Sequence, residues 1–495
     1  MATISATGAA LVWFRRDLRL ADNPALHAAV ATGRPLILVF IDQRSRALGP
    51  APGEAADWWL HGSLSSLARD IAARGGQLSL RRGDPAELIP QLARQHGVAE
   101  VFWNRSGEPA INARDRAIAA KLQAAGTKPH AFAATTLIDP AALLTGSGTP
   151  YKVFGAFWRA ALRDLAPRPS LPVAKQLAMA AELPTGEALE AWALRPVGPD
   201  WATGFTARWQ PGETGAAQRL EAFLDAALDD YAEGRDRPDR PGTSMLSPHL
   251  GFGEISPRQV WHSVQARLAA GANFQAAERF LAEVGWREFA YYLLHHFDDL
   301  RTANFNRSFD HFPWRSDAPG FEAWTRGQTG IPMVDAGMRQ LWTTGWMHNR
   351  VRMVCASFLV KHLRVDWREG MAWFEHTLVD ADRAVNAASW QWVAGSGADA
   401  APYFRIFNPV RQGERFDPDG EYVRQWVPEL ADLPTRWIHQ PWKAPAGLCQ
   451  TAGLKPGQTY PLPICDLATG RDAALSAYKD MKAGIADGLP AYSKT

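Results

Sequence analysis

The chain is 495 residues long, more than one domain usually needs, so two or three domains are expected. Its 46% hydrophobic and 21% charged residues are typical of a soluble globular protein and exclude a disordered chain. The net charge of +2 permits a local basic face for nucleic acid without demanding one, and three scattered cysteines with no Cys-x-x-Cys pair exclude a disulfide framework and argue against a zinc site.

The N-terminus has no basic start before its short apolar run, which Arg15, Arg16 and Asp17 end, so it does not resemble a signal peptide. No run approaches the roughly 18 apolar residues that a membrane helix needs. We therefore expect a cytoplasmic protein without membrane contact.

The first 138 residues alternate short apolar runs with segments of helical period. Strands are predicted at Ala9–Phe14, Leu36–Asp42, Leu78–Arg81, Val101–Asn104 and His130–Leu137, and helices at Ala25–Ala31, Leu60–Ala73, Ala86–Gln95 and Ala113–Ala124. This alternation is typical of a parallel sheet with helices on both faces, which binds ligands beyond the carboxyl ends of its strands. Neither a G-x-G-x-x-G nor a P-loop sequence occurs here, so dinucleotide or nucleoside triphosphate binding in the usual mode is unsupported.

Residues 139–206 are punctuated by Gly and Pro, with one amphipathic helix predicted at Val153–Leu162, so we expect a long connector over the surface. The pattern then becomes helical almost throughout, with a Pro- and Trp-rich tail and a last helix at Ala473–Lys482. The expected architecture is an α/β parallel-sheet domain (1–138), a connector (139–206) and an all-α C-terminal domain (207–495).

The segment Tyr231–Ser256 combines a hydroxyl-rich loop with basic residues. Thr243, Ser244 and Ser247 offer hydroxyl and backbone N–H groups of the kind that hold phosphate oxygens, although a capped turn before a helix would use the same residues. The nearby basic cluster could meet a phosphate backbone or form an ordinary solvated face, and it consists of Arg235, Arg237 and Arg240.

One later helix, Phe280–Leu294, mixes acid and indole on one face. Glu283, Trp286 and Arg287 are spaced i, i+3, i+4 and therefore project to the same side. An acid and an indole together are not a core pattern, and the alternative is a structural Glu–Arg pair with Trp beside it.

The segment Thr344–Met353 repeats this spacing. Asn349, Arg352 and Met353 share one helix face and could contact a polar ring system. The alternative, that Arg352 pairs with an acid such as Asp380, is compatible with the first interpretation.

The stretch Asp380–Pro409 is the densest in polar and aromatic residues. The acids Asp380 and Asp382 precede Asn386, which lies one helical turn before Trp390, and Trp392 follows. Acids, an amide and aromatics this close together favour a flat, conjugated ligand over plain core.

Together these motifs resemble the photolyase/cryptochrome family, and most of all its cyclobutane pyrimidine dimer photolyases. The resemblance covers nearly the whole chain, from LVWFRRDLRLADNPAL (Leu11–Leu26) through TSMLS, WREF, GWMHNRVRM and DWREG (Asp366–Gly370) to FRIFNP. Several long motifs in the same order make this signal specific. It implies an antenna-type α/β domain and a helical domain that holds a U-shaped FAD and binds UV-damaged DNA, acting as a monomer without an obligate protein partner.

The resemblance also assigns roles to individual residues. The FAD-binding set is Tyr231, Thr243, Ser244, Met245, Leu246, Ser247, Phe280, Arg287, Arg352, Asp380, Ala381, Asp382 and Asn386. The set that contacts the dimer is Glu283, Asn349 and Met353, with Trp286 and Trp392 as an aromatic wedge for the flipped bases. The set that grips DNA phosphates is Arg235, Arg350 and Arg405, and the tryptophan relay that reduces the flavin is Trp390, Trp367 and Trp314.

The physical chemistry agrees with these roles. A dimer must leave the base stack to reach a buried cofactor, so the site needs stacking walls and edge-reading groups. Photoexcited reduced FAD would donate an electron, the ring would split and the electron would return, while the protein supplies orientation and electrostatics. Arg352 would favour the flavin anion, neutral Asn386 would add no negative charge beside it, and Glu283 would stabilise the dimer radical anion if its carboxyl is protonated or shares a proton.

A few positions favour one subfamily. Photolyases of the (6-4) photoproduct resemble this chain but place catalytic histidines in the pocket, where this chain has Asn349 and Met353, and His348 falls on a different face. Plant cryptochromes tend to have an acid where Asn386 stands, and many carry a long C-terminal extension. We therefore expect light-driven repair of cyclobutane dimers, with a signalling cryptochrome, a (6-4) photolyase and a non-catalytic flavin-containing DNA-binding protein as alternatives.

A second, antenna chromophore is also expected, either methenyltetrahydrofolate or a deazaflavin. The folate-binding acid of one subgroup would fall near Ile111, which cannot serve. Trp58 and Trp59 resemble the matching helix of plant cryptochromes and related bacterial photolyases, some of which bind folate at a different site. Simple contact between this helix and the sheet is the alternative.

Overall fold

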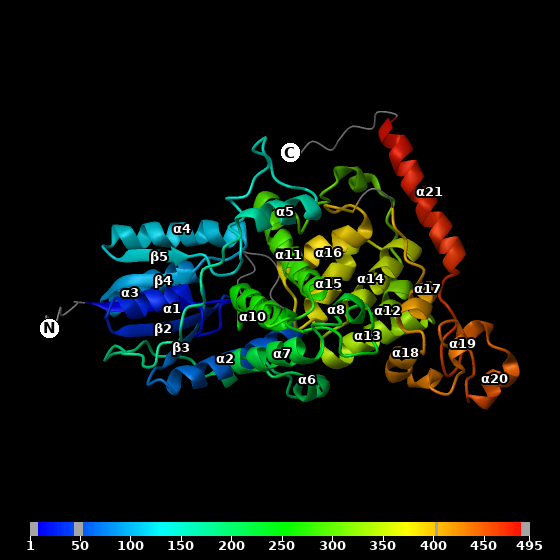
Figure 1. Cartoon of the computed structure of the whole chain (residues 1–495), viewed down its shortest axis with the longest axis horizontal. Coiled ribbons are helices and arrows are strands. Elements are labelled where there is room, and N and C mark those ends of the chain that lie inside the picture. Colours follow the sequence, from blue (N-terminus) through cyan, green and yellow to red (C-terminus); the bar gives the residue numbers. More distant parts are fainter. Residues whose placement is uncertain (1–7, 44–52, 401–403, 487–495) are drawn as a thin grey trace.

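Continuous apolar runs build a parallel sheet in the N-terminal part of the chain. The computed structural model describes residues 8–43, 53–400 and 404–486, and the sheet lies at one end of the molecule (Figure 1). Its strands are β1 Ala9–Phe14, β2 Leu36–Asp42, β3 Leu78–Arg82, β4 Val98–Asn104 and β5 Lys128–Phe132. They lie in the order β3-β2-β1-β4-β5 with every neighbouring pair parallel. All residues of β1 and β2 are buried, as expected for a sheet covered on both faces.

Helices occupy the connections between these strands. They are α1 Pro24–Ala31, α2 Glu54–Ala72, α3 Pro85–Gln95 and α4 Pro109–Ala124. The side chains of Asn23 and Asp84 accept backbone N–H bonds at the starts of α1 and α3, which explains why these helices begin where they do. The predicted parallel α/β architecture is confirmed, and β1 and β2 have the predicted bounds.

The fifth strand is shorter than predicted, because β5 ends at Phe132 rather than at Leu137. Arg258 of the helical part donates to the carbonyl oxygens of Ala133 and Thr136, at 3.3 and 3.2 Å. The N–H group of Leu137 donates to the Glu288 carboxylate at 2.7 Å. Side chains from the other half of the chain thus bind the backbone that the apolar pattern assigns to the sheet.

Residues 139–202 hold little regular structure, and helix α5 Phe154–Asp164 lies where one amphipathic helix was predicted. Beyond α5, the connector runs along the sheet. Leu36 exchanges backbone hydrogen bonds with it, accepting from Ala180 at 2.9 Å and donating to Ala178 at 2.7 Å. This ordered contact explains how a long segment poor in regular structure stays in place.

The remainder of the described chain is helical. Its α-helices are α6 Thr203–Arg208, α7 Glu213–Ala226, α8 Tyr231–Gly234, α9 Ser247–Phe252, α10 Pro257–Ala269, α11 Phe274–His296, α12 Ala318–Thr325, α13 Pro332–Thr344, α14 Asn349–Ser357, α15 Trp367–Thr377, α16 Arg383–Ala394, α17 Pro409–Phe416, α18 Glu421–Trp426, α19 Thr435–Ile438, α20 Ala446–Thr451 and α21 Leu467–Ala486. The last helix starts before the predicted Ala473, because Asp466 accepts the N–H and hydroxyl of Thr469, each at 2.8 Å. No helix among the described residues is both long and apolar enough to span a membrane.

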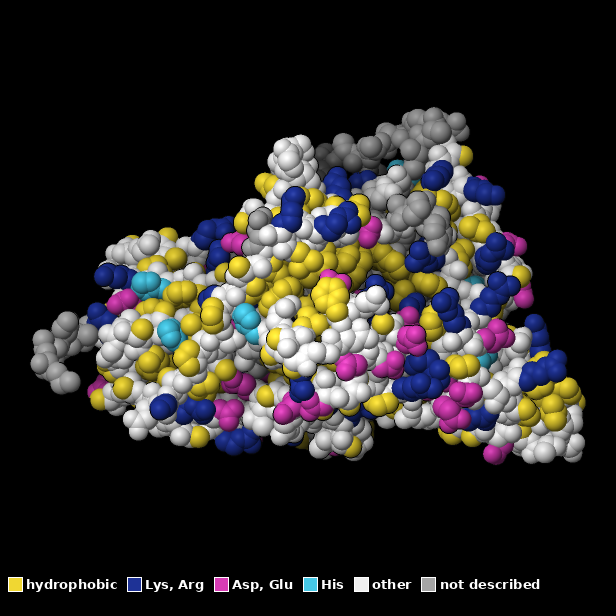
Figure 2. Space-filling view, viewed as in Figure 1, with side chains coloured by type: hydrophobic (Ala, Val, Ile, Leu, Met, Phe, Trp, Pro, Cys, Tyr) yellow, Lys and Arg dark blue, Asp and Glu magenta, His cyan; other side chains and the backbone are white. Residues whose placement is uncertain are grey.

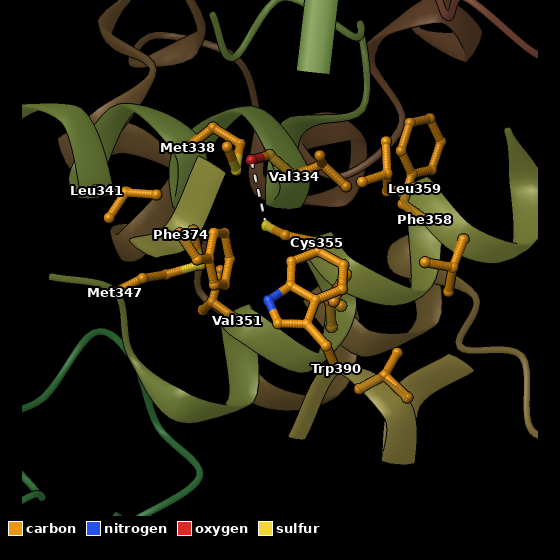
Figure 3. Packing of buried hydrophobic residues seen from close by; sticks show 14 of the residues in the cluster. Val334, Met338, Leu341, Met347, Val351, Cys355, Phe358, Leu359, Phe374 and Trp390 are labelled. Carbon is orange, nitrogen blue, oxygen red and sulfur yellow. Dashed lines mark hydrogen bonds between the residues drawn. The ribbon is translucent and has the colours of Figure 1, made fainter. Parts of the chain in front are cut away.

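A large apolar core fixes the helices that matter for function. In Figure 3, Val334 of α13, Val351 and Cys355 of α14, Phe374 of α15 and Trp390 of α16 point toward one another. Each of these side chains is at most 3% exposed. The Cys355 thiol donates to the Val334 carbonyl oxygen at 3.5 Å, so α13 and α14 are joined by a polar contact inside the core (Figure 3).

Candidate cofactor and nucleic-acid site

The hydroxyl-rich loop lies between α8 and α9 and presents unused backbone donors. Met245 has a φ of +50°, and the next residue, Leu246, is right-handed, an arrangement that forms an anion-binding nest of N–H groups. Among the described residues, no acceptor meets the backbone N–H groups of Thr243, Ser244 or Met245. Such half-buried donors fit the phosphate oxygens of a cofactor, whereas Ser247 is exposed and begins α9.

Two arginines that the sequence reasoning missed lie beside this loop. Arg208 on α6 and Arg219 on α7 place guanidinium nitrogens 3.6 and 3.5 Å from the Met245 sulfur. Burial lowers the pKa of both groups, and no carboxylate in the described residues offsets this effect. Half-buried positive charge without an acidic partner is suited to a phosphate anion. No local pattern marks these arginines, since they come from helices well before the loop.

The aromatic residues assigned to the cofactor form a wall beside the loop. Tyr231 and Phe280 meet edge to face at a ring-centroid distance of 5.3 Å, and Leu246 belongs to the same buried cluster. Burial, assisted by the nearby Glu283 carboxylate, raises the pKa of the Tyr231 phenol, which therefore stays protonated.

Arg352 and Asp380 form the pair that the sequence predicted. The guanidinium Nη1 and Nη2 lie 3.1 and 2.8 Å from the two carboxylate oxygens, in the bidentate geometry that favours a strong charged contact. The Arg352 Nε also donates to the Met347 carbonyl oxygen at 2.7 Å. The Asp380 side chain is 2% exposed and that of Arg352 is 24% exposed, so the positive group lies on the open side.

The other acid of the stretch, Asp382, caps α16. Its Oδ1 accepts the N–H groups of Ala384 and Val385, both at 3.0 Å, which explains why the helix begins at the next residue. One turn along, the Asn386 amide donates to the Met371 carbonyl oxygen at 3.1 Å, so α15 fixes its orientation. Asp380, Asp382 and Asn386 are thus held in place by contacts within the protein, and all are at most 8% exposed.

Arg287 and Ala381 connect the cofactor region to the α/β domain. The Arg287 guanidinium donates to the Thr135 carbonyl oxygen at 2.9 Å, and the Ala381 carbonyl oxygen accepts from Arg16 at 3.5 Å. Burial alone would lower the pKa of Arg287, but the neighbouring Tyr291 and acidic groups outweigh it and raise the pKa. Arg287 therefore remains a fixed positive charge.

Glu283 of α11 has a partner other than the one expected within its helix. It forms an ion pair with Arg235, whose side chain is 9% exposed and lies over the Tyr231 ring at 5.5 Å. The alternative Glu–Arg pairing with Arg287 is therefore absent. Arg235 faces Glu283 rather than open solvent, so this geometry does not support its predicted contact with a DNA phosphate.

The remaining residues predicted to contact the dimer lie on three helices. Trp286 of α11 stacks on Phe154 of α5, with ring centroids 3.9 Å apart and planes 13° from parallel. Asn349 is exposed at the start of α14, and the Met353 sulfur lies 3.8 Å from the Arg350 guanidinium. Trp392 of α16 lies beneath Arg405, whose guanidinium carbon is 5.6 Å from the indole centroid.

His348 has a structural role, as the sequence suggested. It is 2% exposed, and its Nδ1 accepts the backbone N–H of Arg350, which caps α14. Burial lowers the pKa of this imidazole to about 4. The side chain is therefore a neutral cap rather than a charged or titrating group.

Arg350 and Arg405 line one surface cavity of about 490 Å³. Arg350 also pairs with Asp236, at 2.7 Å from Nη2 to the carboxylate. Two more arginines and several phenylalanines line the same cavity, from α17, α21 and the loop before α17: Arg415, Arg471, Phe404, Phe407 and Phe416. Basic and aromatic groups together suit a nucleic-acid strand.

On the face shown in Figure 2, hydrophobic side chains gather in a hollowed band over the region of α11, α14 and α16. Lys and Arg side chains lie around this band, mainly above it and to its right. An apolar hollow with a basic rim fits an extruded base whose flanking phosphates stay outside.

The predicted relay tryptophans differ in exposure. Trp390 and Trp367 are 2% and 0% exposed, whereas Trp314 is half-buried. The Trp390 ring lies against α15, the helix that Trp367 begins, because a Cβ added at Gly370 would come within 2.2 Å of it. Trp324, which the sequence reasoning did not select, lies edge-on to Trp390 at 6.2 Å. Two of the three predicted relay indoles, Trp390 and Trp367, are thus buried, and the third, Trp314, is partly open to solvent.

Trp58 and Trp59 lie in the core between the two halves of the chain. They are 3% and 0% exposed, and the Trp59 indole N–H donates to the buried Glu254 carboxylate at 3.0 Å. Trp58 meets Phe205 edge to face at 5.4 Å. These contacts support a structural interpretation of both tryptophans. Ile111, at the position predicted for the folate-binding acid of one subgroup, lies on α4.

Comparison with known proteins gives consistent similarities over the whole length. Residues 10–176 match the family described as DNA photolyase, and residues 280–480 match the FAD binding domain of DNA photolyase. A deoxyribodipyrimidine photo-lyase of Agrobacterium fabrum is 50% identical over 96% of this chain and 98% of its own length. Cryptochrome-1 of Arabidopsis thaliana is 38% identical over 93% of this chain and 68% of its own. The crystal structure of a bacterial class III photolyase from Agrobacterium tumefaciens superposes with a TM-score of 0.93 at 49% identity, covering 97% of this chain and 100% of that one.

Proposed function

Because the chain belongs to the photolyase/cryptochrome family, we propose that it repairs cyclobutane pyrimidine dimers in UV-damaged DNA, using light and bound FAD. The observation that carries this proposal is the surface over α11, α14 and α16. These helices carry buried polar side chains, and a hollowed apolar band with a basic rim lies over the same region. An enzyme that acts on an extruded base needs such a pairing of cofactor site and base pocket.

The residues present fit FAD. The unused N–H groups at Thr243–Met245 would hold the phosphates, with Arg208 and Arg219 as counter-charges. Asp380, Asp382 and Asn386 would lie against the ribityl and ring groups, and Arg352 would balance a negative ring. When bound, reduced FAD supplies the light-driven electron that splits the dimer.

The protein's own groups position and isolate the dimer. Trp286 and Trp392 would form stacking walls, while Asn349 and Met353 would contact the paired bases from α14. Glu283 would meet the carbonyl or imide edge of the dimer, and Arg235 fixes the direction of this carboxylate. Arg350 and Arg405 would bind backbone phosphates at the rim, which sets the register of the strand.

Electron entry to the cofactor is assigned to Trp390, Trp367 and Trp314. The proposal rests on the family resemblance and on two buried indoles, Trp390 and Trp367, with the half-buried Trp314 as the third. A second chromophore, methenyltetrahydrofolate or a deazaflavin, would act as an antenna. We further propose domain boundaries near residues 138 and 206, action as a monomer without an obligate protein partner, and a cytoplasmic location.

A signalling cryptochrome is the alternative, since cryptochromes are among the relatives. Two observations favour repair. The position at which plant cryptochromes tend to have an acid holds Asn386, whose neutral amide is fixed by α15, and a hollowed apolar band with a basic rim lies over the region of α11, α14 and α16.

The deciding experiment measures loss of thymine dimers from an oligonucleotide under blue light. The reduced, FAD-loaded protein should restore the dimers to thymines, and a dark sample should not. If the protein binds the damaged oligonucleotide but leaves the dimers intact under light, the repair proposal fails. The same assay with a (6-4) photoproduct tests the other photolyase activity, for which no change is expected.

A further inference from the structure

One phenol links α11 to the acid stretch and to the α/β domain. The Tyr291 hydroxyl donates to Oδ2 of Asp382 at 2.5 Å, while Oδ1 of the same carboxylate accepts the two capping N–H groups of α16. Both oxygens of Asp382 are therefore engaged, and among the described residues the Tyr291 bond is the only one to this carboxylate from outside α16. Sequence reasoning attached no role to Tyr291.

Tyr291 is itself held by two neighbours. The Arg287 guanidinium lies over its ring at 4.7 Å. The ring also lies close to Gly107, where an added Cβ would come within 2.1 Å of Cδ1. Just beyond, Glu108 pairs with Arg383 at 3.2 Å, so the α/β domain also contacts the first residue of α16 directly.

The phenol is suited to act as a permanent donor. Tyr291 is 7% exposed, and burial together with the Asp382 charge raises its pKa well above the ordinary value. The hydroxyl therefore keeps its proton throughout the range in which proteins work. A charged acceptor makes this bond stronger than a neutral one.

We propose that Tyr291 is a positioning residue for the Asp382 carboxylate, and that Gly107 lets the α/β domain hold the phenol in place. The inference rests on the proposed flavin-facing role of Asp382. Without the bond, Oδ2 is freed and its negative charge is less neutralised beside the cofactor. FAD then binds less firmly, and reduction to an anionic flavin becomes less favourable.

Tyr291→Phe tests this directly, because it removes only the hydroxyl. FAD should leave the full-length holo-protein roughly tenfold faster, as followed by the fluorescence of released flavin, which is the size expected for one charged hydrogen bond. The midpoint potential of the bound flavin should move to a lower value. A role confined to stability would change the unfolding temperature and leave the potential unmoved, which would overturn the inference.

Gly107→Ala perturbs the contact between Gly107 and Tyr291 from the α/β domain. Its methyl group should displace the Tyr291 ring and shift the potential in the same direction, because the three atoms nearest to that position all belong to the Tyr291 ring. Gly447→Ala is the matched control, since a Cβ there meets nothing within 4 Å. Equal potentials in all of these proteins would overturn the inference.

Asp382→Asn separates the inference from the function on which it rests. If Asp382→Asn speeds FAD loss and Tyr291→Phe does not, Asp382 keeps its role and the proposal for Tyr291 falls. If Asp382→Asn leaves both FAD binding and the flavin midpoint potential unchanged, the flavin-facing role of Asp382 is wrong. The inference for Tyr291 is then wrong as well.

Discussion

Glu283 and Arg235, which the sequence assigns to the dimer and to a DNA phosphate, form an ion pair with each other. The Arg235 side chain is 9% exposed and that of Glu283 is 28% exposed, so the carboxylate is the more accessible partner. The pair is extended by Asp236, which lies next to Arg235 and pairs with Arg350. One chain of charges thus runs from Glu283 to Arg350 at the surface cavity.

This pairing predicts that Arg235 and Arg405 affect DNA binding in different ways. Arg405→Gln should lower the slope of log Kd against log salt concentration by about 0.9, the value for one lost phosphate contact. Arg235→Gln should weaken binding of a dimer-containing oligonucleotide and leave this slope unchanged, because Arg235 acts through Glu283. A slope reduced equally in both variants would show that Arg235 reaches a phosphate.

The role of Glu283 itself predicts a separable effect. Glu283→Ala should lower both the repair yield per absorbed photon and the preference for damaged over undamaged DNA, since it removes the group that meets the edge of the bases. The measurements are light-driven repair and competitive binding, with the exposed Glu278→Ala on the same helix as control. If Glu283→Ala leaves the repair yield and the preference for damaged DNA unchanged, Glu283 serves only as the structural partner of Arg235.

The parts of the fold that depend on local patterns could be predicted from the sequence. β1 and β2 are continuous apolar runs, so their bounds follow from composition alone. β5 could not be bounded in this way, because Arg258 and Glu288 bind the backbone beyond Phe132 from another domain. Contacts of this kind join residues more than a hundred positions apart and leave no trace in a local pattern.

The candidate site likewise contains features that the sequence could predict and features that it could not. The pairing of Arg352 with Asp380 follows from opposite charge and the family resemblance, and the structure contains it. Arg208, Arg219 and Tyr291 lack such signals, since ordinary helical positions carry them and only folding brings them to the loop and to Asp382. Side chains that act through other side chains are the hardest to find from sequence.

Trp390 is predicted to serve electron entry and not repair. Trp390→Phe should suppress light-driven reduction of oxidised flavin while sparing repair by chemically reduced protein, because the buried indole provides the first step of the relay. Flavin absorbance under illumination measures the first effect and the dimer assay the second. Trp437→Phe, remote on α19, should change neither. Unimpaired photoreduction in Trp390→Phe would remove this residue from the relay.

Breaking the Arg352–Asp380 pair should cost stability asymmetrically. Arg352→Met leaves a carboxylate that is 2% exposed without its partner, which should lower the free energy of unfolding by roughly 3 kcal/mol. Asp380→Asn leaves the Arg352 guanidinium without its charged partner. Because this side chain is 24% exposed and can reach water, the loss in free energy of unfolding should be smaller than for Arg352→Met. Urea unfolding of both single variants and the double variant gives the coupling energy. Additive losses would mean that the pair contributes nothing as a unit.

The domain junction should make stability depend on pH through Glu288. This carboxyl is 2% exposed and accepts the N–H groups of Leu137 and Ile138 at 2.7 and 3.2 Å. Burial raises its pKa to about 7, although Arg287 and the two N–H bonds act in the opposite direction. The unfolded chain loses this proton near the ordinary pKa of 4.5, so the folded protein binds more protons between pH ~4.5 and ~7.

Stability should therefore fall as the pH rises through that window and level off above it, because the proton held only by the folded state is progressively lost. Glu288→Gln keeps an acceptor for the two N–H groups and cannot titrate, so its urea midpoint should vary less with pH across the same window. The exposed Glu221→Gln on α7 is the control and should follow the unmodified protein. If Glu288→Gln and Glu221→Gln show the same pH profile, Glu288 does not couple proton binding to the domain junction.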